Sequence, residues 1–410
     1  MNKLDRPAVK LSDAEQTLVG LLRDRGADET ARRLETVGLP TRRVEAYHFT
    51  DLKVMLREVP DRLADRVAGK SGAPTLKGAT GIRLVNGILG GHDKLPAGLE
   101  VSSGKGAGAL SDDIVDLIGA GFARGTVRLL LTKSQQRPIH LDLRTEGEAS
   151  VSTARVEIEI GDAVEATLLQ TWSSTNEAHL VNAGVTVRLG KNATLTHVQI
   201  DLQDGAVRQL VHVDFQISAG AKLRTLTINN AAILSRLGLS ARFNGAGAHA
   251  DFTGLNLSGG SQHHDITLNV SHAVPGTTSK ELFKSIARDR AKAVFQGKIV
   301  VERDAQKTDA KMMAQGLMLS EGAEIIHKPE LEIFADDVVC GHGATCGDLD
   351  EAALFYLMSR GIPRPTAESM LIRAFVAELF EPIEDEALRA LLDGLVDTWL
   401  GAGTGVRAAA

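Results

Sequence analysis

The sequence predicts a mainly β protein built around a β-helix, with α-helical regions at both ends. Aromatic residues make up only 4% of a chain that has 41 glycines and 43% hydrophobic residues, so Val, Ile, Leu and Ala must form its core. From about Val127 to Phe334, short runs alternate between apolar and polar residues, as in "ARVEIEI" and "VHVDFQI". Glycine-led turns at 161, 190, 220 and 247 recur at intervals of 29, 30 and 27 residues. Such a repeat must stack on its neighbours to bury its apolar face. A β-sandwich is the rival fold, but it usually has more aromatic residues and less regular spacing.

The region before these strands is predicted to be helical. The stretch "LSDAEQTLVGLLRDRG" begins with Ser12 and Glu15 at capping-box spacing and ends at Gly26. A second helix is expected over "ETARRLETV", with Asp28 as its cap and Gly38 as its end. The Gly/Pro-rich stretch "SGAPTLKGATG" then indicates a linker or a cluster of turns.

After Gly347 the pattern becomes helical again. One helix is expected from an Asp cap to Gly361, a second from Thr366 to Phe380, and a third over "DEALRALLDGLVDTWL". We expect their apolar stripes to pack on the end of the solenoid and on each other; the alternative is a docking face for a partner. The predicted regions are therefore 1–75 (N-terminal helices), 76–347 (β-helix core) and 348–410 (C-terminal helices).

Charge and composition exclude several classes of function. With 46 basic and 52 acidic residues, the net charge of -6 does not indicate binding to nucleic acid or to anionic lipid. No apolar run approaches the roughly 20 residues that cross a bilayer, and the N-terminus resembles neither a secretion signal nor a transit peptide. Two cysteines in 410 residues are too few for the disulfide bonds that stabilise secreted folds, which favours a reducing, cytoplasmic location.

Motifs for a self-sufficient active site are missing or incomplete. "ADRVAGKS" (64–71) has the Gly-Lys-Ser of a phosphate loop, but it has Ala64 in place of the first glycine and no preceding strand. In "QHHD", His263, His264 and Asp265 follow one another in a strand, so neighbours point to opposite faces; we interpret them as surface residues.

Both cysteines flank a histidine in "DDVVCGHGATCGDLD". Cys340, His342 and Cys346 have only His327 as a nearby further ligand, so a closed four-ligand zinc site is not expected. Two readings remain from the residues alone. The cysteines are small core residues at a strand end, or thiol and imidazole form an incomplete site, suited to iron–sulfur species or a transition metal, that a partner completes.

A long segment around these residues resembles the SufB/SufD family of iron–sulfur cluster assembly scaffolds. The matching motifs are "FQGKI", "QKTDA", "KPELEIFADDVVCGHGAT" and "LFYLMSRGI", and "GLPTRRVEAYHFTDL" resembles an N-terminal signature of the family, so the likeness spans nearly the whole chain. Ala314 and Gln315 stand in the segment where the SufB branch carries a cysteine, which favours the SufD branch.

The resemblance implies a right-handed parallel β-helix and a non-enzymatic scaffold, cytoplasmic, that works with SufB and the ATPase SufC and forms a homodimer when isolated. It implies no cofactor in the isolated chain, and a nascent iron–sulfur cluster held with SufB at His342, with Cys340 as an auxiliary ligand. It also implies that the C-terminal helices dock SufC. The residues assigned to that docking face are Thr366, Met370, Leu371, Phe375 and Phe380.

This chain departs from the family pattern at two positions. Gly341 replaces the usual serine, which should loosen the turn, and Cys346 stands where the family usually has an apolar residue. We expect Cys346 to be a buried near-isostere rather than a second thiol of the site. The alternative function is a metal-dependent enzyme of β-helix or cupin type that uses Cys340, His342 and His327.

Overall fold

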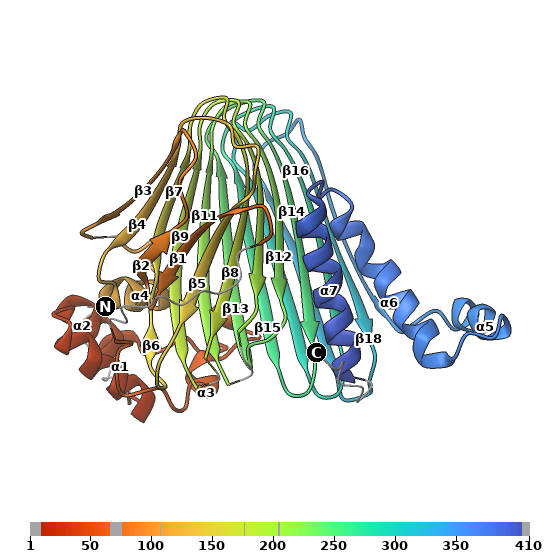
Figure 1. Cartoon of the computed structure of the whole chain (residues 1–410), viewed down its shortest axis with the longest axis horizontal. Helices are drawn as coiled ribbons and strands as arrows, with labels where there is room; N and C mark the ends of the chain where they lie inside the picture. Colours follow the sequence, from red (N-terminus) through yellow and green to blue (C-terminus); the bar gives the residue numbers. More distant parts are fainter. Residues whose placement is uncertain (1–9, 66–75, 107, 176, 204–205, 404–410) are drawn as a thin grey trace.

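The computed structural model describes residues 10–65, 76–106, 108–175, 177–203 and 206–403, and it confirms a mainly β protein with a parallel β-solenoid at its centre (Figure 1). Most of the "ADRVAGKS" stretch lies outside the described residues. Two ten-stranded sheets form the walls of the solenoid. We call the space between them the lumen, and the two walls sheet A and sheet B.

Each coil contributes one strand to each sheet. Sheet B runs, in spatial order, through β2 (Ile88–His92), β1 (Thr80–Val85), β5 (Ile139–Thr145), β8 (Glu165–Ser174), β10 (Thr194–Asp201), β12 (Lys222–Asn229), β14 (His249–Ser258), β16 (Thr278–Ala287), β18 (Asp309–Met318) and β20 (Val339–Gly347). Sheet A runs through β19 (Glu324–Ile333), β17 (Lys292–Val301), β15 (His263–His272), β13 (Leu234–Phe243), β11 (Arg208–Ile217), β9 (Leu180–Leu189), β7 (Arg155–Ile160), β4 (Thr126–Leu131) and β3 (Leu99–Gly104), with β6 (Val151–Ser152) beside β9.

The predicted period is the coil of the solenoid. His249 of β14 pairs with Thr278 of β16, one coil further along the chain, and the strands pair in parallel without a register shift. Because the register is kept, residues at equivalent positions stack in rows along the axis. Inward rows hold mostly small and aliphatic side chains, and Phe283 stacks on Phe295 across the lumen with ring centroids 4.1 Å apart.

The N-terminal helices form as predicted, with one difference. Helix α1 (Asp13–Asp24) has the complete capping box of Ser12 and Glu15. Helix α2 (Asp28–Val37) begins at Asp28 itself, so the residue before it is the cap and the predicted Asp28 cap is wrong. The short α3 (Leu52–Met55) follows. The sequence reading missed α4 (Ile114–Phe122), which packs on β9 and on the first two helices.

Residues 45–50 cross the outer face of sheet A, and we call them the N-terminal clasp. They contain a 3₁₀ turn (Glu45–Tyr47). The Arg236 guanidinium lies 4.1 Å from the centre of the Tyr47 ring and donates to the carbonyl of Ala46 at 2.6 Å. Arg236 also pairs with the buried Asp265, to which the Thr50 hydroxyl donates. The clasp therefore ties the N-terminal region to the middle of the solenoid.

The clasp also corrects the interpretation of the "QHHD" stretch. His263 and Asp265 point out of the sheet, but both are buried, because Thr50 lies over them and its hydroxyl oxygen is 2.9 Å from His263 Nε2. His264 points into the lumen, where its Nε2 donates to the carbonyl of Ala232 at 2.9 Å. The predicted alternation of faces holds, whereas the predicted surface location is wrong.

The C-terminal helices cover the side of the solenoid rather than its end. Helices α6 (Arg364–Phe380) and α7 (Glu386–Gly403) lie on the outer face of sheet B (Figure 1), and their apolar stripes belong to one buried cluster with residues of β8 to β18. Lys284 on that face donates to Glu378 at 2.7 Å, and Arg288 stacks on Trp399 at 4.0 Å. Helix α5 (Glu351–Ser359) extends away from the solenoid (Figure 1).

The two ends of the solenoid differ. At the first end, β2 and β3 run antiparallel to their neighbours, and α1, α2 and α4 pack nearby. At the other end, the strand order of the described residues stops at β19 in sheet A and β20 in sheet B, so each of these strands has an edge with no strand beside it. We call this the open end. None of the helices in the described part of the chain is long and apolar enough to cross a bilayer.

Candidate functional site

Strand β20 places Cys340, His342 and Cys346 on the lumen side of the open end. Cys340 pairs with Ala310 of β18 and His342 pairs with Met312, and both of these partners belong to the lumen core. Since side chains alternate along a strand, residues 340, 342, 344 and 346 all face inward. Because no strand of the described chain stacks on the far edge of β20, inward side chains there are accessible from the open end.

Cys340 and His342 differ in exposure. Cys340 is half-buried and packs against the lumen core, and this burial raises the pKa of its thiol. His342 is exposed. An imidazole in this position is free to coordinate, whereas the thiol needs a metal or a nearby positive charge before it ionises at neutral pH.

Cys346 is exposed, so the prediction of a buried near-isostere is wrong. It pairs with Gly316 of β18, and a Cβ at that glycine would lie 3.1 Å from the Cys346 sulfur. A thiol at position 346 therefore occupies the space that Gly316 leaves open at the end of the lumen.

His327 lies beside Cys346 rather than beside Cys340. A Cβ at Gly316 would also lie 3.1 Å from Cε1 of His327. Nε2 of His327 lies 3.3 Å from the hydroxyl oxygen of Ser285. Burial lowers the pKa of His327 to about 4. Cys340, His342 and His327 do not form a three-ligand site, and among the described residues no group of three or more His, Cys, Asp or Glu side chains is placed to hold a metal ion. The metal-dependent enzyme alternative is not supported.

The sequence reading missed a buried carboxyl group next to the open end. Glu281 faces the lumen in the row that continues through Met312 to His342. Its side chain is 1% exposed, and neither carboxyl oxygen has a hydrogen-bond partner in the described chain. Burial raises its pKa to about 8, so it is mostly protonated at neutral pH. In a strand of alternating apolar and polar residues, a glutamate is expected on the surface, so the sequence pattern did not predict the burial of Glu281.

Large apolar side chains surround the open end and cover α5. Near the turn between β19 and β20, Phe334 and Val339 are 60% and 61% exposed. On α5, Phe355 is 74% exposed and Tyr356 is 57% exposed. Exposed apolar clusters of this kind are candidate interaction surfaces.

The residues predicted to dock a partner on α6 fall into two groups. Thr366 and Met370 are exposed and Leu371 is partly exposed. Phe375 packs on the sheet and stacks with Lys284, and Phe380 is 2% exposed in the cluster beneath the helix. Phe380 therefore belongs to the packing contact between α6 and sheet B. The docking role of the other residues stays a prediction.

Fold and site together define a class of protein: a parallel β-solenoid whose strand order in the described chain stops at an edge that carries histidine and cysteine on its lumen side. The family model described as "SUF system FeS cluster assembly, SufBD core domain" matches residues 143–375. The chain belongs to the SufB/SufD family.

The chain is similar to several known proteins. The iron–sulfur cluster assembly protein SufD of Escherichia coli is 29% identical over 389 residues, which covers 90% of this chain and 91% of that protein. An iron–sulfur cluster assembly SufBD family protein of Synechocystis is 33% identical over 50% of this chain and 46% of its own length. The chloroplastic protein ABCI7 of Arabidopsis thaliana is 28% identical over 58% of this chain and 51% of its own length.

Proposed function

We propose that this chain is a SufD-like subunit of the Suf iron–sulfur cluster assembly system and works as a scaffold rather than as an enzyme. The observation that carries this proposal is the inward-facing pair of Cys340 and His342 on the uncovered edge strand β20, in a chain that matches the family along nearly its whole length. The cluster is the cargo of this site, and a partner supplies the remaining ligands.

The partner at the open end is a SufB-type subunit. An unpaired strand edge presents backbone donors and acceptors that another β-solenoid can continue, and the exposed Phe334 and Val339 add apolar surface beside it. Joined in this way, the partner's thiolates meet the His342 imidazole, and thiolate with imidazole is a donor set that suits iron. A second copy of this chain can occupy the same edges when no partner is present, as a homodimer.

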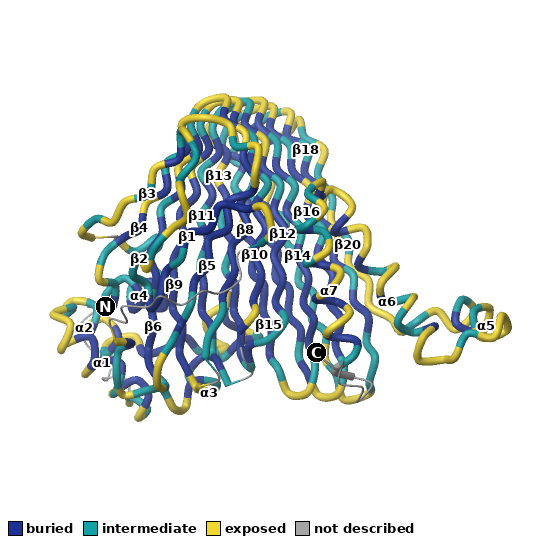
Figure 2. The backbone as a smooth tube through the Cα atoms, in the orientation of Figure 1, coloured by how far each residue is buried: buried dark blue, intermediate teal, exposed yellow. Residues whose placement is uncertain are grey.

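The ATPase SufC docks on the C-terminal helices, and it supplies the ATP hydrolysis. The exposed apolar side chains of α5, which projects from the solenoid (Figure 2), and the exposed Met370 on α6 support this assignment. Free thiols at a shared site fit a reducing compartment, and we place the protein in the cytoplasm on that ground.

Point substitutions test the two docking surfaces better than truncation, since α6 and α7 cover apolar residues of sheet B. Val339→Lys with Phe334→Lys should abolish co-purification with a co-expressed SufB-type subunit and leave SufC bound. Phe355→Glu should release SufC and leave the SufB-type subunit bound. The assignment of surfaces fails if the Val339 and Phe334 changes release SufC, or if Phe355→Glu releases the SufB-type subunit.

A further inference from the structure

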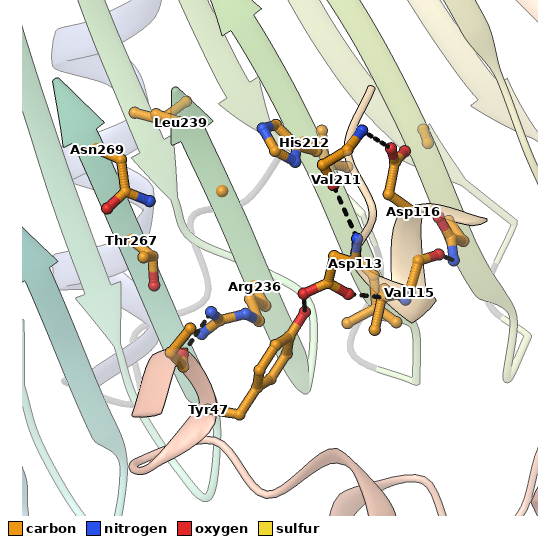
Figure 3. Close-up of a pocket in the computed structure, with 16 residues that line it drawn as sticks. Tyr47, Asp113, Val115, Asp116, Val211, His212, Arg236, Leu239, Thr267 and Asn269 are labelled. Carbon is orange, nitrogen blue, oxygen red and sulfur yellow. Dashed lines mark hydrogen bonds between the residues drawn. The ribbon is translucent and has the colours of Figure 1, made fainter. Parts of the chain in front are cut away.

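The outer face of sheet A carries a cavity of about 250 Å³. Strands β9, β11, β13 and β15 form its floor, and the N-terminal clasp and the start of α4 form its roof (Figure 3). Figure 3 shows Tyr47 and Asp113 on one side of the cavity and His212 and Asn269 on another. Because β17 separates β15 from the edge strand β19, this cavity is distinct from the open end.

The cavity exists because one position of its floor has no side chain. His212 of β11 pairs with Gly184 on one side and Gly238 on the other. Arg155 fills the space above Gly184, where a Cβ would lie 2.0 Å from its guanidinium nitrogen. A Cβ at Gly238 would meet no described heavy atom closer than 3.8 Å, and Gly238 is not among the glycines with positive φ. Neither backbone strain nor crowding requires a glycine at 238.

The hydrogen bonds of His212 determine which ring nitrogen faces this space. Ser240 donates its hydroxyl proton to Asp214 at 2.7 Å, so it has none left for the imidazole. Nε2 of His212, 2.9 Å from the same hydroxyl oxygen, must therefore be the donor. Burial lowers the pKa of His212 and keeps the ring neutral. The lone pair is then on Nδ1, which lies 3.9 Å from the Cβ position at Gly238.

The ionised groups of the cavity wall are already bonded within the protein. Arg236 pairs with Asp265, and Asp116 pairs with Arg155. Asp113 accepts the hydroxyl of the clasp tyrosine at 2.9 Å. A charged ligand would thus have to break a buried ion pair or hydrogen bond to find a counter-charge, which is costly.

Two of the polar groups of the wall that are available to a ligand lie on the strands of the floor. One is the acceptor Nδ1 of His212. The other is the carboxamide of Asn269, which forms no hydrogen bond within the described residues and is exposed. An acceptor and a group that can donate, on the wall of one small cavity, are together complementary to a molecule with an N–H next to a carbonyl. Amides and lactams have this edge.

We propose that this cavity binds a small, neutral molecule with an amide or lactam edge, whose N–H donates to Nδ1 of His212 and whose carbonyl accepts from Asn269. The cavity is smaller than most ligand pockets, which have volumes of roughly 300 to 1,000 Å³, so one ring with its substituent is the size that fits. The site is independent of the proposed cluster assembly role.

Nicotinamide and nicotinate are matched probes, because they have the same ring and nearly the same size but differ in charge. Titration calorimetry and ligand-observed NMR on the full chain should show one nicotinamide site. Nicotinate should bind about tenfold more weakly or not at all, since its carboxylate would meet the lone pair of Nδ1 and no free cation. Absence of nicotinamide binding, or equal binding of the two probes, would overturn the proposal.

Three variants locate the site. Gly238→Leu should fill the cavity and abolish nicotinamide binding, whereas Gly341→Leu, at another strand glycine with open space above it, should not. His212→Phe keeps the ring and removes Nδ1, and Asn269→Ala changes only an exposed side chain; each should weaken binding about tenfold. If Gly238→Leu fails to fold, these two variants decide. Unchanged binding in Asn269→Ala and His212→Phe would show that nicotinamide binds elsewhere.

Discussion

Nε2 of His327 lies 3.3 Å from the hydroxyl oxygen of Ser285, and this contact ends a row of bonded side chains inside the solenoid. Asn229 donates to Asn256 at 3.1 Å, and Asn256 donates to Ser285 at 3.5 Å. These residues pair on successive strands of sheet B, so the row runs along the axis. A polar row thus runs through the lumen and reaches the open end at Cys346.

Removing the middle of this row should destabilise the protein. Asn256→Leu removes the acceptor of the Asn229 side-chain amide and one of the two contacts of the Ser285 hydroxyl. Each buried polar group left unsatisfied costs about 1 to 3 kcal/mol. Urea unfolding should therefore show a loss of a few kcal/mol, and Asn269→Ala, at an exposed position, should show none. Equal stability of the two variants would mean that the row contributes nothing.

The ion pair beneath the N-terminal clasp should contribute more than any surface pair. Asp265→Asn leaves Arg236 without its buried counter-charge, which typically costs about 3 to 5 kcal/mol. Glu157→Gln breaks the exposed pair with Arg128 and should cost no more than about 1 kcal/mol. Thermal unfolding of both variants measures the difference. A change in Tm for Asp265→Asn as small as that for Glu157→Gln would contradict the structural role of the clasp.

Acid should destabilise the fold before most carboxylates titrate. Burial lowers the pKa of six histidines from 6.5 to about 4, namely His140, His197, His263, His264, His272 and His327. Between these two values the unfolded chain binds more protons than the folded chain, so stability is present above pH 6.5 and is lost as the pH falls toward 4. The free energy of unfolding lost through these six histidines should be on the order of several kcal/mol. Urea unfolding at pH 7.5, 5.5 and 4.5 tests this, and a flat profile would refute it.

Glu281 should have the opposite pH dependence. Its folded pKa of about 8 lies above the ordinary value of 4.5, so the folded chain binds more protons in that interval and loses stability as the pH rises through it. Glu281→Gln removes this loss. The variant should exceed the parent protein in stability at pH 8 by on the order of a few kcal/mol, and the difference should shrink toward pH 5. A difference independent of pH would show that Glu281 does not titrate in this range.

The sequence predicts those parts of the fold that depend on local pattern. Turn spacing from Gly161 to Gly247 reflects the length of a coil, and the capping box at Ser12 depends on neighbours only three residues apart. The burial of His263 and Asp265 was not predictable in this way. It depends on Thr50, which is more than 200 residues distant in the chain and lies over them only after folding.

Position along the solenoid explains the other misses. The apolar residues that recur along one side of the helix ending at Trp399 predict that this side is buried, but they do not indicate which surface covers it. That surface is the outer face of sheet B, which forms only when strands of successive coils come together. Cys346 was expected to be buried because the family usually has an apolar residue at its position. It is exposed because no further coil follows β20 in the described chain.

The central claim is that His342 contributes to a cluster site shared across the open end. The most direct test is to co-express the chain with a SufB-type subunit and SufC, purify the complex anaerobically, and measure iron, acid-labile sulfide and visible absorbance per complex. His342→Ala changes an exposed side chain, so the complex should assemble normally but hold much less cluster than the parent complex. Cys346→Val, exposed on the same strand, serves as the control and should retain the cluster. A full complement of cluster in the His342→Ala complex, or loss of cluster with Cys346→Val alone, would contradict the account.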